Sequence, residues 1–166
     1  FGLALSTGHE SDAEYLDVVL REAPSSSTVE QLPARLVPVL PAGIEVQRAV
    51  ALAAGADSLQ QAVTSCTWHI EVADIAPPDA ASGVARALAA TELALTRERK
   101  GNTVTDDVRP AIRDLRVLGP VTEVVAPLAP RRSGLGTKLE AELATQPRAL
   151  RPVELVAAID PDWVVA

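Results

Sequence analysis

The segment Cys66–Ile75 constrains the fold most, because its side chains alternate between apolar and polar. In an extended strand, Trp68 and Ile70 point to one side, and His69 and Glu71 point to the other. Strands buried in parallel sheets are usually apolar on both sides, so this alternation favours an antiparallel sheet. Helices must then cover the apolar face, which leaves the opposite face or the rim available to another molecule.

Other segments repeat the strand pattern or show the period of an amphipathic helix. Strands are predicted at Phe1–Leu5, Glu14–Leu20, Ile44–Leu52, Leu93–Arg99, Thr103–Val108 and Val121–Leu128. Helices are predicted at Thr28–Val37, at Pro77–Thr91, around Leu139 and Leu143, and from Pro152 onward, with one or two helical turns in Ser58–Ser65. The remaining segment, Arg109–Leu118, reads as a turn followed by a short strand.

The order of the first six elements, strand, helix, strand, strand, helix, strand, predicts the fold class. It matches a split βαβ, or ferredoxin-like, arrangement: an α+β fold with an antiparallel sheet and helices on one face. Additional C-terminal strands and helices follow. We expect residues 1–166 to form a single α+β domain. Because Phe1 stands inside a strand pattern and no methionine is present, we expect an N-terminally truncated fragment of a longer chain.

The composition limits the chemistry that this chain can perform. Only four residues are aromatic while 48% are hydrophobic, so the core must be mainly aliphatic. The single Cys66 excludes an internal disulfide and an iron–sulfur cluster held by several thiolates, and it is a small core residue in our interpretation. No metal site, no cofactor and no catalytic residue is predicted. No apolar stretch approaches the ~18 residues of a membrane span, so a cytoplasmic protein without a membrane partner is expected.

Charge is distributed unevenly along a chain whose formal net charge is −7. Residues 97–138 hold nine basic and five acidic side chains, and such asymmetry can mark a face for an anionic partner such as RNA. The candidate binding residues are Arg97, Arg99, Lys100, Arg109, Arg131, Arg132 and Lys138. The alternative is a set of solvated surface charges paired with acidic neighbours. No aromatic residue lies between positions 69 and 162, which excludes a base-stacking platform there.

The densest polar cluster begins at His9 and Glu10. One interpretation makes His9 a general base that is oriented by a nearby carboxylate, with Asp17 as a third member of an uncharacterised active site. The alternative is a loop in which Ser11 and Asp12 satisfy backbone amides.

Several short segments, taken in order, resemble the bacterial radical-SAM-linked protein family, a family of unknown function. The matching stretches are Gly8–Ser11, Ala13–Asp17, Leu40–Val46, Ser58–Leu59, Trp68–Ile70, Arg99–Gly101, Asp107–Pro110 and Leu115. Members of this family normally have about fifty further residues before the position of Phe1, including a Ser-His pair.

The resemblance implies a non-catalytic accessory or substrate-presenting module for a radical SAM enzyme, acting on RNA or ribosomal substrates. Members are often encoded beside such an enzyme or fused to it. The family supplies no catalytic residues. Two alternatives stay open: an RNA-binding domain that uses a basic face in residues 97–138, and an enzyme centred on His9 and Glu10.

Overall fold

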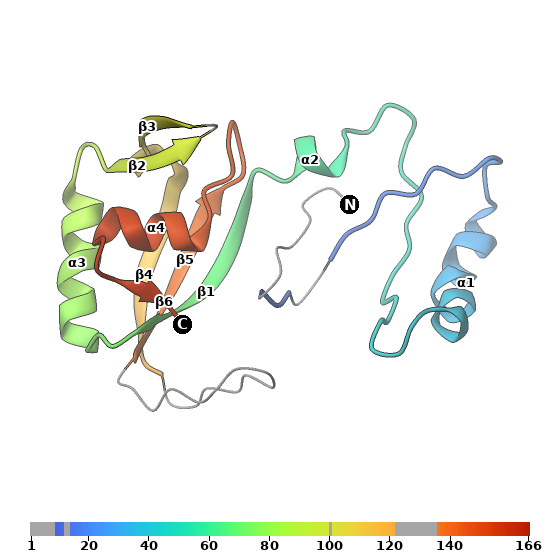
Figure 1. The fold of residues 1–166 in the computed structure, drawn as a ribbon. Helices are drawn as coiled ribbons and strands as arrows, with labels where there is room; N and C mark the ends of the chain where they lie inside the picture. Colours follow the sequence, from blue (N-terminus) through green and yellow to red (C-terminus); the bar gives the residue numbers. More distant parts are fainter. Residues whose placement is uncertain (1–8, 12–13, 100, 122–135) are drawn as a thin grey trace. The chain divides into compact units, whose positions relative to one another are not determined.

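The computed structural model describes residues 9–11, 14–99, 101–121 and 136–166 (Figure 1). The chain divides into two compact units, Phe1–Ala62 and Val63–Ala166. The single-domain organisation stays a prediction.

The first unit contains the predicted helix. Helix α1 spans Ser26–Leu36, followed by a 3-10 turn, Val37–Val39, and later by the single helical turn α2, Leu59–Ala62. The Ser25 side chain accepts a hydrogen bond from the backbone N–H of Thr28, and such an acceptor is a common start signal for helices. Helix α1 therefore begins two residues before the predicted start.

Two predicted strands of the first unit are wrong. Residues 14–20 and 44–52 form no strand, and most of their apolar side chains are exposed: Leu16 is 55% and Val18 is 65% accessible. Alternation produces a strand only where a neighbouring strand pairs the backbone and another layer buries one side. In the described part of this unit, neither segment has such a neighbour. The predicted strand Phe1–Leu5 lies outside the described residues.

The second unit is built on a four-stranded antiparallel sheet with the strand order β4-β5-β1-β6. The strands are β1 (Ser65–Ala73), β4 (Ile112–Pro120), β5 (Gly136–Ala144) and β6 (Val164–Val165). Strand β1 pairs with β5 over its whole length. The prediction of an antiparallel sheet containing Cys66–Ile75 is therefore confirmed.

Helices cover the apolar face of this sheet, as predicted. They are α3, Pro77–Ala89, and α4, Pro152–Ile159, and each begins with a proline, which is favoured in a first helical turn (Figure 1). Val84 of α3 and Leu155 of α4 join Ile70 in one buried cluster. The protein is thus an α+β protein.

The buried cluster is aliphatic, in agreement with the scarcity of aromatic residues. Its members are Ile70, Val72, Ala80, Val84, Leu95, Val108, Ile112, Leu115, Leu139, Ala141, Leu143, Leu150, Leu155 and Val156. Trp68 and Trp163 are half-buried and pack against its margin.

A separate hairpin lies between α3 and β4. It consists of β2, Ala94–Arg99, and β3, Asn102–Asp107, which confirms the predicted hairpin. Two hydrogen bonds connect the two ends of this hairpin. The backbone N–H of Val108 donates to the backbone oxygen of Leu93 at 2.9 Å, and the backbone N–H of Leu93 donates to Asp107 Oδ1 at 2.8 Å.

The predicted helix around Leu139 and Leu143 is wrong, because these residues lie in β5. A spacing of four residues fits one face of a helix and one face of a strand equally well. Thr137 and Ala141 complete the buried side of β5. Most of the predicted strand Val121–Leu128 lies outside the described residues.

Candidate functional site

The sheet face opposite α3 and α4 presents charged side chains to water. We call it the polar face, defined by His69 and Glu71 of β1, Arg113 and Arg116 of β4, and Lys138, Glu140 and Glu142 of β5. These strands place their apolar residues in the core, so the alternate residues must point outward. The antiparallel register aligns His69, Glu140 and Arg116 in one row and Glu71 with Lys138 in another. Arg113 lies at a bulge, and the residues directly opposite Glu142 are Thr67 and Asp114.

The middle row of the polar face centres on Glu140. Its Oε2 lies 3.0 Å from His69 Nε2, and its Oε1 accepts a hydrogen bond from Arg116 Nη2. The Glu140 side chain is only 19% exposed, whereas His69 and Arg116 are 56% and 60% exposed. The carboxylate therefore holds two cationic or hydrogen-bonding groups at the surface in a defined arrangement.

The two outer rows are ordered in the same way. Lys138 Nζ lies 3.8 Å from Glu71 Oε1 in one row. In the other, Ser65 Oγ donates to Glu142 Oε1 at 2.6 Å, while Arg113 Nη1 donates to Ser65 Oγ at 3.1 Å. Exposed ion pairs contribute little to stability. Their consequence here is a surface of mixed charge in which each basic side chain lies beside a carboxylate.

The structure does not gather the described members of the predicted basic set. Arg97 lies on the hairpin, where its Nη2 donates to Asp106 Oδ2 at 2.7 Å. Lys138 belongs to the polar face and Arg109 follows the hairpin. The side chain of Arg99 and the residues Lys100, Arg131 and Arg132 lie outside what is described. RNA binding through this set stays a prediction.

Arg109 holds backbone segments together. Its Nη2 donates to the oxygen of Leu88 at 3.0 Å, near the end of α3, and its Nη1 donates to the oxygen of Ile112 at 3.3 Å. Its Nε is buried and, among the described residues, has no hydrogen-bond partner. An arginine near the end of a helix satisfies carbonyl groups that have no partner within the helix.

Replacing Arg109 by Met should therefore lower the free energy of unfolding, by about 1–2 kcal/mol, because the carbonyls of Leu88 and Ile112 lose their charged donor. Urea unfolding followed by circular dichroism measures this change. The matched variant Arg86→Met removes an exposed arginine of α3 and should change stability by less than about 0.5 kcal/mol. Equal effects of the two substitutions would contradict the assigned role.

The predicted cluster of His9, Glu10 and Asp17 belongs to the first unit. Asp17 Oδ2 accepts a hydrogen bond from the backbone N–H of Leu59 at 3.2 Å, so it supports the first residue of α2. His9 is half-buried and Glu10 is exposed. Catalysis centred on these residues stays a prediction.

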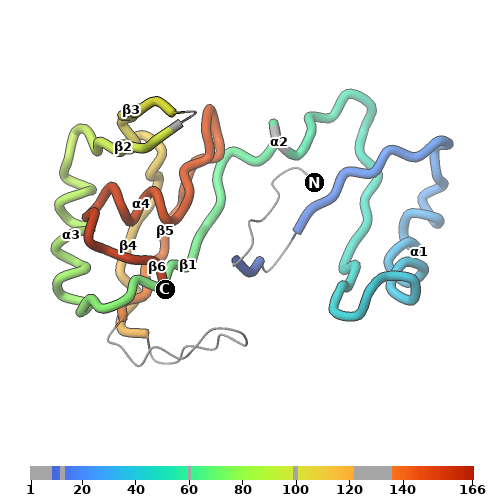
Figure 2. The backbone as a smooth tube through the Cα atoms, in the orientation of Figure 1, coloured from blue at the N-terminus to red at the C-terminus, as the bar shows by residue number. Residues whose placement is uncertain are grey.

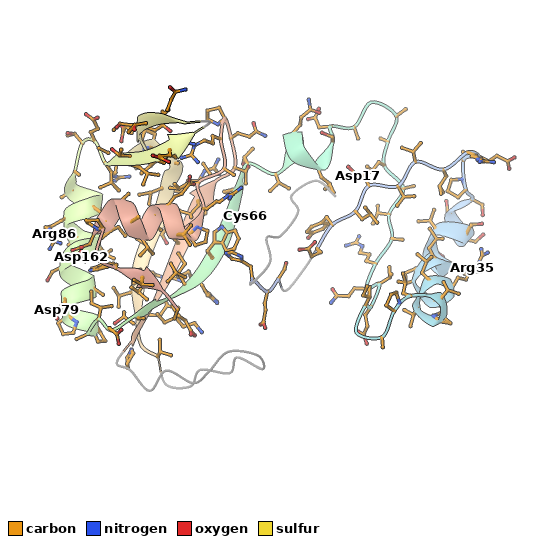
Figure 3. All side chains as sticks on the ribbon, in the orientation of Figure 1. Asp17, Arg35, Cys66, Asp79, Arg86 and Asp162 are labelled. Carbon is orange, nitrogen blue, oxygen red and sulfur yellow. The ribbon has the colours of Figure 1, made fainter. Side chains whose placement is uncertain are left out.

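Cys66 lies in β1 on the side of Trp68 and Ile70, and it is half-buried (Figure 3). Burial raises the pKa of its thiol, which reduces the fraction of reactive thiolate at neutral pH. This environment fits the interpretation of Cys66 as a packing residue.

The described ranges, 9–11, 14–99, 101–121 and 136–166, hold neither a metal-binding cluster nor a membrane-spanning helix. No group of three or more His, Cys, Asp or Glu side chains in those ranges is placed to hold a metal ion. None of the helices described above is long and apolar enough to cross a membrane.

Comparison with known protein families identifies the family to which this chain belongs. Residues 1–152 match the model of DUF2344, described as an uncharacterized protein conserved in bacteria. The chain belongs to the DUF2344 family. The predicted membership of a bacterial family of unknown function is thereby confirmed, and the link of DUF2344 proteins to radical SAM enzymes stays a prediction. No curated protein and no solved structure matches this DUF2344 chain.

Proposed function

We propose that this DUF2344 chain is a non-catalytic accessory module that presents a substrate to a radical SAM enzyme, and that it contacts its partner through the polar face. The observation that supports this proposal is the ordered arrangement of charges around Glu140 on a sheet face that neither α3 nor α4 covers. The resemblance of the sequence to radical-SAM-linked proteins supplies the class of partner.

The balance of charge on the polar face favours a protein partner over a nucleic acid. Arg113, Arg116 and Lys138 are matched there by Glu71, Glu140 and Glu142. Nucleic-acid interfaces need an excess of positive charge to replace counterions around the phosphates. A surface with both signs selects a partner whose own charges are complementary, and it fixes the orientation of the two proteins.

We also infer that the second unit is a split βαβ, or ferredoxin-like, fold. Two observations support it. Helix α3 and the hairpin connect β1 to β4, and β5 lies between these two strands. Helix α4 then connects β5 to β6, which lies beside β1. The hairpin β2–β3 is an insertion in this arrangement.

The test uses the intact protein and the radical SAM enzyme encoded nearest to it, mixed under anaerobic conditions. We expect a complex measurable by biolayer interferometry. Replacing Arg116 by Glu puts a second carboxylate beside Glu140, and it should weaken this complex by roughly tenfold or more, as reversing a charge in a complementary interface does.

The control is Arg86→Glu, which reverses one exposed charge on α3, away from the polar face (Figure 3). Affinity should then change less than about twofold. No complex with the wild-type chain, or equal loss in both variants, would count against the proposal.

A further inference from the structure

The sheet has one edge that is only partly paired. Strand β1 has nine residues, but on the side of β6 only Val72 and Ala73 face a partner strand. One additional hydrogen bond joins the N–H of Ala166 to the oxygen of Glu71 at 2.8 Å. Among the described residues, no strand pairs with the remaining part of this edge, Ser65–Ile70. Figure 2 shows the short strand β6 beside one end of β1.

The direction of the free backbone groups follows from the Glu71 contact. Backbone groups of alternate residues point to the same side of a strand. Because the oxygen of Glu71 points toward β6, the N–H and C=O groups of Ser65, Thr67 and His69 point toward the same open side. These three residues thus present donors and acceptors at regular spacing that no strand in the described ranges pairs.

The opposite edge of the sheet, formed by β4, has features that hinder pairing with another chain, and the edge formed by β1 lacks them. Strand β4 has irregularities in register between Ile112 and Asp114 and again between Val117 and Gly119, and it ends with Pro120. Bulges, prolines and charges are the usual devices that keep an edge from pairing with another chain. The segment 65–69 of β1 has no proline, no bulge and no lysine.

We propose that this edge is a homodimer interface, in which Ser65–His69 pairs antiparallel with the same segment of a second copy. Thr67 faces Thr67 of the second copy at the two-fold axis. The three outward-pointing residues of each chain then exchange their backbone hydrogen bonds, and the two sheets become one continuous sheet.

The segment is complementary to itself in this register. Ser65 lies opposite His69 on the polar face, and Cys66 lies opposite Trp68 on the apolar face. No two acidic or two basic side chains meet, because Glu71 lies beyond the paired residues. Alignment of polar with polar and apolar with apolar residues stabilises neighbouring strands, and two-fold symmetry lets both copies use the same segment without opposing like charges.

Sedimentation equilibrium of the intact protein tests the proposal first. We expect a concentration-dependent mass up to twice that of the 17.4 kDa chain. Hydrogen exchange then locates the contact: the amides of Ser65, Thr67 and His69 should gain protection as concentration rises. The amides of Cys66 and Trp68 point toward β5 and should be protected at every concentration.

The decisive variant is Thr67→Lys, which places two lysines opposite each other across the two-fold axis. It should raise the dissociation constant of the dimer roughly tenfold or more. The matched control Thr103→Lys changes an exposed threonine of the hairpin and should leave the dimer unchanged.

A second variant, Thr67→Pro, removes the outward N–H without removing a hydrogen bond between β1 and β5, and it should abolish the dimer. A wild-type chain that is monomeric at all concentrations, or a dimer that survives both substitutions at Thr67, would overturn the proposal.

Discussion

Leu139→Ala is expected to lower the free energy of unfolding by about 3 kcal/mol, the largest effect of any single truncation that we predict. Leu139 is completely buried in β5, where it faces Ile70 of β1 and Val117 of β4. Removal of three carbon atoms from this position loses their transfer free energy and leaves a cavity between two helices and the sheet. Urea unfolding followed by circular dichroism measures the change.

Leu118→Ala is the matched control for this substitution. Leu118 lies in β4 of the same sheet and is 46% exposed, so its truncation should cost less than about 1 kcal/mol. If Leu139→Ala had an equally small effect, the strand assignment of residues 136–144 would be wrong. That segment would then have to bury a different set of side chains.

Gly83→Val is expected to destabilise the second unit by about 2 kcal/mol, because the interior of α3 has no room for a side chain there. A Cβ atom at Gly83 would lie 2.5 Å from Cη2 of Trp163 and 3.3 Å from Cγ2 of Ile159. The indole ring must therefore move away from the helix. Equilibrium unfolding measures the loss of stability, and a red shift in tryptophan emission reports the displaced ring.

Ala85→Val adds a β-branched residue to the exposed side of the same helix. Only the lower helix propensity of valine opposes it, at a cost of about 0.5 kcal/mol. A similar loss at both positions would mean that Trp163 does not pack on Gly83.

Local patterns predicted the second unit better than the first. In β1, alternation around Ile70 coincides with a real neighbour, β5, and with helices that bury one side. Residues 14–20 show an equally clear alternation, yet Val18 is exposed. The difference lies in contacts between distant segments, and no window of sequence contains that information.

The strand β5 was missed for another reason. Its residues Lys138, Glu140 and Glu142 alternate with apolar residues, but lysine, glutamate, leucine and alanine all favour helices. The alternation is the signal for a strand, but the prediction followed the four-residue spacing of Leu139 and Leu143, which fits a helix equally well. Once β5 is placed, its register with β1 and β4 determines the charge rows of the polar face.

Candidate site residues were predictable only in part. The outward direction of His69 and Glu71 follows from the strand pattern, but their partners come from strands about seventy residues further along the chain. The role of Arg109 depends on the carbonyl of Leu88, which no charge count indicates. The positive charge of Arg109 suggested anion binding, whereas its hydrogen bonds to two backbone carbonyls give it a role in stabilising the fold.

The closure at the base of the hairpin has an evolutionary consequence. Leu93, Asp107 and Val108 hold the two ends of the hairpin together, and Leu95, which joins the buried cluster, lies near this base. The sheet therefore does not depend on the tip of the hairpin. Insertions or deletions near Gly101 would lengthen or shorten the hairpin without disturbing the four-stranded sheet. The length of the hairpin can therefore vary among relatives during evolution while the four-stranded sheet stays constant.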